Sequence, residues 1–103
     1  MRLLFDDRAL GDLEGIHHWI SQDSPRSAKA VVDRIFESVE LLASFPYMGR
    51  AGRDEGTREW VVPRLPYIVV YEMNEASDEM IVIAVFHGAR DWPDRLKERR
   101  GGP

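Results

Sequence analysis

The chain has 103 residues, of which 44% are apolar and 31% are charged, and its formal net charge is −4. This length fits one domain, and the apolar content excludes an intrinsically disordered chain. An acidic chain also lacks the basic excess with which dedicated nucleic-acid binders neutralise phosphate. We therefore expect a single domain over residues 1–103, in which residues 99–103 form a frayed tail.

The sequence contains no cysteine, whereas secreted domains of this size often carry disulfides, so a reducing cytosol is expected. Residues 1–7 reach two aspartates before a long apolar run can form, which argues against a signal peptide. No stretch approaches the roughly 20 apolar residues of a membrane-spanning helix. A cytoplasmic protein without membrane contact is predicted.

The N-terminal half predicts a strand followed by two helices. Residues 2–5 are a short apolar run that can open as a strand, and Asp6 or Asp7 can cap the helix that follows. The apolar stripe of this first helix consists of Leu10, Leu13, Ile16 and Ile20, broadened by Trp19. Ser24-Pro25 starts the second helix, which ends near Ser44 because residues before a proline avoid the helical region. The short connection predicts an antiparallel helical hairpin.

The C-terminal half predicts a sheet. Residues 46–56 hold three glycines and a proline and indicate a surface loop. Strands are then expected at residues 57–62, 67–71 and 80–86, joined by short turns into an antiparallel meander. The first strand is expected at one edge, and a short helix is expected to start at residue 91. The predicted fold class is α+β, a two-layer sandwich of a helical hairpin on a small antiparallel sheet.

Several kinds of chemistry have no motif here. The sequence lacks a Gly-rich phosphate loop, a zinc pattern and a nucleophile elbow, so no cofactor and no metal are expected. His17 and His18 follow Glu14 on the first helix, but a Glu-x-x-His metal site in a helical bundle needs a second matching helix. We expect one surface histidine and one half-buried histidine at this place.

His87 is the strongest candidate for a functional histidine. It directly follows an apolar strand and precedes Gly88, where another backbone can come close. Arg90 and Trp92 lie just beyond it. The alternative, equally open from the residues, is that His87 caps the strand and packs on Trp92.

Arg58 is the second candidate. At the start of a strand it shares a face with Trp60, and an arginine at the rim of a surface is a frequent interaction hot spot. The alternative is a surface ion pair with Asp54 or Glu55, which would contribute little to stability. Trp19 and Trp60 themselves are expected in the core.

Six sequence elements together resemble the RelE/ParE family of toxins from bacterial type II toxin–antitoxin systems. They occur in order along nearly the whole chain, and the spacing of the set carries the resemblance more than any single element. The elements are ALGDLEGIHHWI (9–20), SPRSA (24–28), FPYMGRAG (45–52), GTREWVV (56–62), PYIVVYEM (66–73) and VFHGARDWP (85–93).

The resemblance implies the two-helix, antiparallel-sheet fold and two kinds of activity. RelE-like members cut mRNA inside the ribosome with basic and acid–base side chains, whereas ParE-like members poison DNA gyrase. RNA-cutting members that resemble this chain typically carry an arginine at the position of Ile68. Metal-free RNA cleavage needs a cation beside the scissile phosphate, which isoleucine cannot supply.

The sequence therefore favours a ParE-like toxin, not an enzyme, that binds gyrase and is held in a hetero-oligomer by a cognate antitoxin. Its expected partner-binding residues are Arg58, His87, Arg90 and Trp92. One alternative is a ribosome-dependent, metal-independent mRNA endonuclease that uses His87, Arg58 and Arg90 as catalytic residues. Another is a relic or adaptor that only binds a partner.

Overall fold

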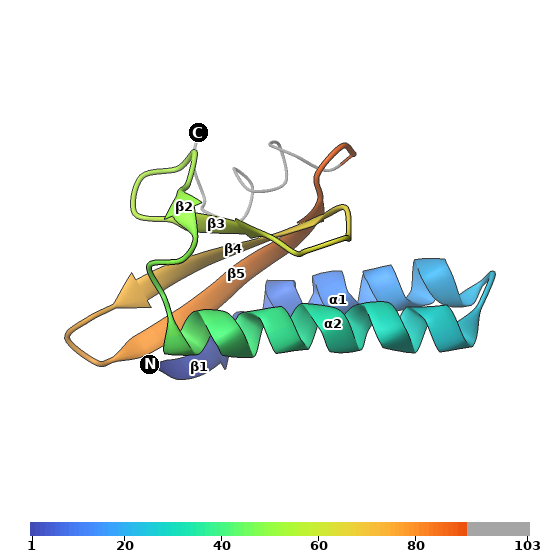
Figure 1. Ribbon diagram of the computed structural model, residues 1–103, viewed down its shortest axis with the longest axis horizontal. Helices are drawn as coiled ribbons and strands as arrows, with labels where there is room; N and C mark the ends of the chain where they lie inside the picture. Colours follow the sequence, from blue (N-terminus) through green and yellow to red (C-terminus); the bar gives the residue numbers. More distant parts are fainter. Residues whose placement is uncertain (91–103) are drawn as a thin grey trace.

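The computed structural model describes residues 1–90, which form two layers (Figure 1). Helices α1 (Asp7–Ser21) and α2 (Pro25–Ser44) lie side by side on one face of a five-stranded sheet. The strands are β1 (Arg2–Phe5), β2 (Arg50–Ala51), β3 (Arg58–Val61), β4 (Tyr67–Asn74) and β5 (Glu79–His87). This architecture confirms the predicted fold class. The helix expected from residue 91, the side chain of Trp92 and the tail at 99–103 lie outside the described residues.

Both helices begin and end where the sequence signals place them. The side chain of Asp6 caps α1 by accepting a hydrogen bond from the Arg8 amide at 2.8 Å. Ser24 caps α2 in the same way, with Pro25 as its first residue. α2 ends at Ser44, two residues before Pro46. Neither helix is long and apolar enough to cross a membrane.

The sheet order is β1-β5-β4-β3-β2, and β3, β4 and β5 form the predicted antiparallel meander. The sheet is nevertheless mixed, because β1 at the predicted edge pairs parallel to β5. A parallel pairing is possible here because no tight turn joins the two strands. β2 at the other edge is a second departure from expectation, since it lies within the segment predicted as a loop. Two residues are too few to give a periodic signal.

The main core lies between the helices and the sheet. It includes Ala9 and Leu13 of α1, Ile35, Val39 and Leu42 of α2, and Val69, Tyr71 and Val82 of the sheet. Trp60 packs against this core as expected, but Trp19 is 60% exposed, so its predicted burial was wrong. The reason is the helical geometry: Ile20 continues the inward-facing apolar stripe of α1, and successive side chains of a helix differ by about 100°, so Trp19 points away from the core. Leu10, also assigned to the stripe, is exposed as well.

An ion pair joins the parallel strands β1 and β5, because Arg2 donates a hydrogen bond to its register partner Glu79. This bond, helped by one from the Ser77 hydroxyl, holds the pKa of Glu79 below its usual value. A carboxyl with a lowered folded-state pKa stabilises the fold above its unfolded pKa, and the contribution disappears as the pH falls through the folded value.

We therefore expect Arg2→Gln to lower the thermal midpoint at pH 6, and the gap from the wild type to close by about pH 3. Thermal unfolding followed by circular dichroism across this range measures the gap. Arg64→Gln, at an exposed turn, is the control that should show no pH-dependent gap. A gap for Arg2→Gln that stays constant on acidification would contradict the assignment.

Candidate functional site

The segment Phe45–Gly49, here called the clamped segment, follows α2 and is hydrogen-bonded to side chains of the sheet. The Tyr71 hydroxyl of β4 donates to the Pro46 carbonyl at 2.6 Å and accepts from the Gly49 amide at 3.1 Å. Tyr71 is fully buried. A buried phenol with both functions satisfied fixes two points of the backbone that passes over it.

Arg58 of β3 supplies the second clamp. Its guanidinium donates to the Tyr47 carbonyl at 3.0 Å and to the Gly49 carbonyl, and it lies 5.4 Å from the centre of the Tyr47 ring. The side chain is half-buried. Arg58 therefore does what neither sequence-based alternative anticipated: it holds the backbone of its own chain.

Two glycines let the segment approach the sheet. A Cβ at Gly49 would collide with the Tyr71 hydroxyl and stand 2.8 Å from the Glu59 carbonyl oxygen, and one at Gly52 would collide with Thr57. Glu59 is 3% exposed and accepts from the Arg53 amide at 2.9 Å and from the Arg50 guanidinium at 3.2 Å. The elements FPYMGRAG and GTREW thus form one hydrogen-bonded unit.

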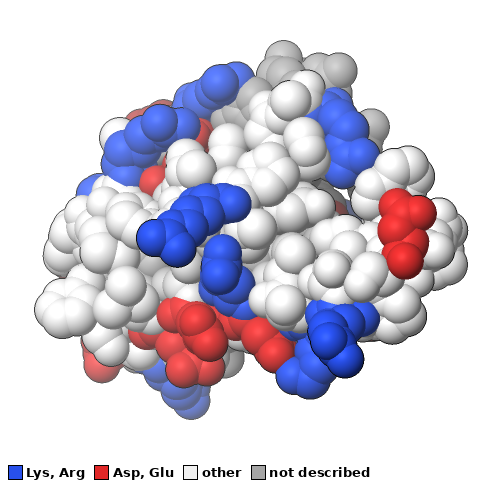
Figure 2. All heavy atoms as spheres, turned by 45° about the vertical axis from the view of Figure 1, so that its right-hand side comes forward, with Lys and Arg blue, Asp and Glu red and all other residues white. Residues whose placement is uncertain are grey.

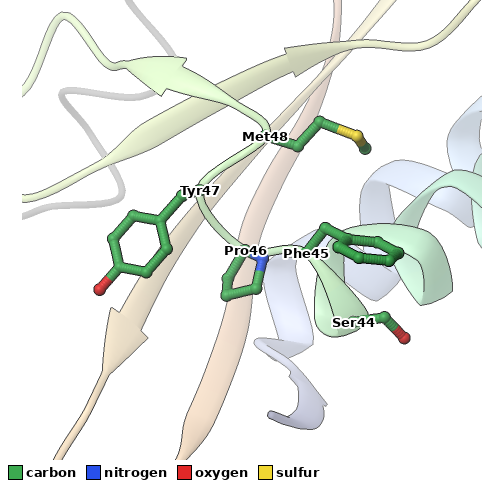
Figure 3. A pocket seen from close by; sticks show the side chains of 5 residues that line it. All are labelled: Ser44, Phe45, Pro46, Tyr47 and Met48. Carbon is green, nitrogen blue, oxygen red and sulfur yellow. The ribbon is translucent and has the colours of Figure 1, made fainter.

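The clamped segment presents apolar side chains to solvent. Phe45 and Tyr47 are 60% and 62% exposed, and Met48 is also exposed. Residues Ser44–Met48 line an open hollow of about 500 Å³. Figure 3 shows Phe45 and Met48 on one side of the segment and Tyr47 on the other. The Tyr47 hydroxyl donates to Glu75, whose carboxylate raises the pKa of Tyr47.

His87 is the last residue of β5, one residue beyond the end of the strand predicted at residues 80–86. Its ring packs edge-on against Tyr67, with centroids 5.7 Å apart, and its Nδ1 accepts from the Ala89 amide at 3.2 Å. Arg90 lies over the ring of Trp19, 5.4 Å from its centre. Trp19, which was expected in the core, is thus an exposed partner of Arg90 at the C-terminal end of α1.

The structure does not bring Arg58 and His87 together. Arg58 pairs with Tyr71 and His87 pairs with Tyr67, so four residues of β4, or about 13 Å, separate them along the strand. They also lie on opposite neighbours of β4. Ile68 is half-buried and alternates to the sheet face opposite Tyr67. The described residues therefore form no single basic hollow from Arg58, His87 and Arg90.

The paired histidines of α1 are both exposed, so the expectation of one half-buried histidine was wrong. His17 and Glu14 line an open groove of about 380 Å³ between α1 and α2. The other lining residues are Leu10, Leu13, Val32 and Phe36. Within residues 1–90, no three His, Cys, Asp or Glu side chains gather as a metal site would require.

Charges are mixed on the face shown in Figure 2. Lys and Arg side chains are distributed over it, with Asp and Glu side chains and broad uncharged areas between them. Continuous basic tracks are what single-stranded nucleic-acid binders use to follow a phosphate backbone. On this face charges of both signs are interspersed instead.

Two solved structures share this fold. The chain aligns with a protein of the chromosomal ParDE toxin–antitoxin system of P. aeruginosa at a TM-score of 0.74 and 23% identity, over 84% of this chain and 95% of that one. It aligns with a protein of the E. coli RelBE toxin–antitoxin complex at a TM-score of 0.65 and 18% identity, over 86% and 98%. The fold is thus that of the RelE/ParE toxins.

Sequence comparison is more specific. The family described as the ParE toxin of type II toxin–antitoxin systems, parDE, matches residues 3–92. Putative toxin Y4kP of Sinorhizobium fredii is 38% identical over 95 residues, which cover 92% of this chain and 96% of that protein. Toxin RelE2 of Caulobacter vibrioides is 32% identical over 83 residues, which cover 81% and 90%. The chain belongs to the ParE toxin family of type II toxin–antitoxin systems.

Proposed function

We propose that this toxin is ParE-like in action: it binds DNA gyrase in the cytoplasm and inhibits it without catalysing a reaction of its own. The observation that carries the proposal is the engagement of Arg58, whose guanidinium holds the carbonyls of Tyr47 and Gly49. A ribonuclease of this fold needs a cation free to stabilise a phosphate, and Ile68 supplies none at the strand position. The match to the ParE family points the same way.

A cognate antitoxin is the second proposed partner, in a hetero-oligomer with the toxin. Both solved structures of similar fold come from systems that contain an antitoxin. The groove between α1 and α2 is apolar at its base and carries Glu14 and His17 at its side. A disordered antitoxin segment that orders on binding could bury its own apolar side chains there.

One specific observation favours the alternative of a ribosome-dependent mRNA endonuclease. The imidazole of His87 stands at a strand end, half-exposed, and its Nδ1 accepts a backbone hydrogen bond. This fixes the proton on Nε2 of the neutral ring, which leaves a group suited to general acid–base chemistry. The likeness to Toxin RelE2 agrees with this reading.

Purified toxin, added in excess to gyrase and plasmid DNA, is expected to block supercoiling or to accumulate cleaved DNA. The same preparation is expected to leave mRNA intact on translating ribosomes, and His87→Ala is expected to act on gyrase as the wild type does. Absence of any effect on gyrase at high toxin excess would remove the proposal. Cutting of mRNA that His87→Ala abolishes would establish the endonuclease instead.

Harmless overexpression, with neither effect in the two assays, would identify a protein that only binds a partner. Arg58, Arg90 and Trp92 stay predictions as partner-binding residues alongside His87. Each can be replaced in the gyrase assay, with the caution that Arg58 also holds the clamped segment and must be compared at equal folded fraction.

A further inference from the structure

The apolar side chains at the C-terminal end of α2 form one exposed surface. Leu41 is 47% exposed, and Phe45 follows it by one helical turn. The Met48 amide donates to the Phe45 carbonyl at 3.0 Å, which places Met48 beside Phe45 (Figure 3). We call Leu41, Phe45 and Met48 the α2-end patch. Aromatic residues and Met are enriched at the centres of protein interfaces, where a few side chains carry most of the binding energy.

This patch is rigid before it meets a partner. The backbone that carries Phe45 and Met48 is fixed by the buried Tyr71 hydroxyl and by Arg58. A backbone segment that is already held in place loses less conformational freedom when its side chains bind a partner. The chain thus holds the exposed side chains of Phe45 and Met48 on a backbone that is hydrogen-bonded to buried or half-buried side chains of the sheet, an arrangement that core packing does not require.

The border of the patch on α2 is acidic. Between residues 37 and 44 the charged side chains are Glu37 and Glu40, both exposed: Glu37 lies one turn before Leu41, and Glu40 directly precedes Leu41. Within residues 1–90 neither carboxylate forms an ion pair. An apolar centre with unpaired carboxylates beside it complements a partner surface that is apolar at its centre and basic at its rim.

We propose that the α2-end patch is the surface with which this toxin docks on gyrase. The inference rests on the proposed function. An enzyme that binds DNA carries Lys and Arg side chains that contact the phosphates. The acidic border of the patch is complementary in charge to such a basic surface. The acidic net charge of the chain would assist the encounter.

The test is the gyrase assay with four variants made in the full chain. Phe45→Ala and Glu40→Lys change the patch and its border. Val61→Ala is the matched control for Phe45, since Val61 is 48% exposed on β3. Asp23→Lys is the matched control for Glu40, because Asp23 lies in the turn at the opposite end of α2. All four positions are exposed, so the thermal midpoints should stay close to that of the wild type.

The expected result is that Phe45→Ala and Glu40→Lys each need at least about tenfold more toxin for half-maximal effect on gyrase, the loss typical of a hot spot. The two controls should need the same amount as the wild type. If the wild type acts on gyrase and all four variants act as strongly as the wild type, the docking surface is elsewhere. The inference then fails while the proposed function stands. If the variants keep their effect on gyrase but escape a co-expressed antitoxin, the antitoxin occupies the patch and the inference fails. If the wild type itself has no effect, the proposed function fails first.

Discussion

Replacing Gly49 with alanine is expected to lower the free energy of unfolding by about 2–4 kcal/mol, or roughly 10–20 °C in thermal midpoint. The added methyl group would collide with the Tyr71 hydroxyl and press on the Glu59 carbonyl oxygen at 2.8 Å. The backbone can relieve the collision only by moving away from Tyr71, which breaks the bond from the Gly49 amide and leaves buried polar groups unpaired. Urea unfolding followed by tryptophan fluorescence measures the loss.

Gly11→Ala is the matched control, because the same change at another glycine should have the opposite sign. Gly11 lies inside α1, and a Cβ there would meet nothing within 4 Å. Alanine costs less conformational entropy than glycine in a helix, so the free energy of unfolding should rise by up to about 1 kcal/mol. Two alanine variants that destabilise equally would show that the approach of the clamped segment to Tyr71 is not tight.

Arg58→Leu is expected to lower the free energy of unfolding by about 2 kcal/mol. The variant loses two hydrogen bonds from a charged donor and the contact of the guanidinium with the Tyr47 ring. Part of this loss is offset, because leucine also removes the buried Nε of Arg58, which has no hydrogen-bond partner among the described residues and is therefore unfavourable in the wild type. Hydrogen exchange should report faster exchange at the Gly49 amide, since the backbone on both sides of it is released.

The comparison variant is Arg34→Leu on the exposed surface of α2, which should change stability by no more than about 0.5 kcal/mol. If Arg58→Leu proves as stable as Arg34→Leu and yet loses its effect on gyrase, Arg58 is a contact residue rather than a clamp. The free energy of unfolding of Arg58→Lys should lie between those of Arg58→Leu and the wild type, because a lysine ammonium lacks the planar guanidinium group that reaches two carbonyls.

The fold could be predicted from the sequence because its signals are local. Asp6, Ser24 and Pro25 mark helix starts, and the runs of β-branched and aromatic residues in β4 and β5 mark strands. The parallel pairing of β1 could not be predicted in the same way, since it depends on residues 77 positions apart in the chain, as Arg2 and Glu79 are. The exposure of Trp19 was missed because the sequence pattern defines the edge of a helix's apolar stripe only to within about one residue. Trp19 lies just beyond that edge.

The candidate site was harder to predict than the fold. Arg58 and His87 were singled out from the sequence, but the contacts that each makes depend on long-range partners. Arg58 holds the clamped segment through the carbonyls of Tyr47 and Gly49. The periodicity of apolar residues in the sequence does not predict where those carbonyls lie. Phe45 was passed over although it lies in a quoted element. The signal that could have found it is a short run, ended by Gly49, in which the large apolar residues Phe45, Tyr47 and Met48 follow a helix end with no strand or helix pattern to bury them.

The parallel pairing of β1 also constrains the order in which the molecule can be completed. Arg2–Phe5 is synthesised before the other helices and strands of this fold, yet its register partners are Glu79–Val82 of the last strand. The helical hairpin can form early from local contacts, but the sheet that covers its apolar face closes only after β5 has been synthesised. A nascent toxin therefore exposes the face of its helices that the sheet will cover until β5 has been synthesised, so a partner already present in the cell could engage it before it is fully folded.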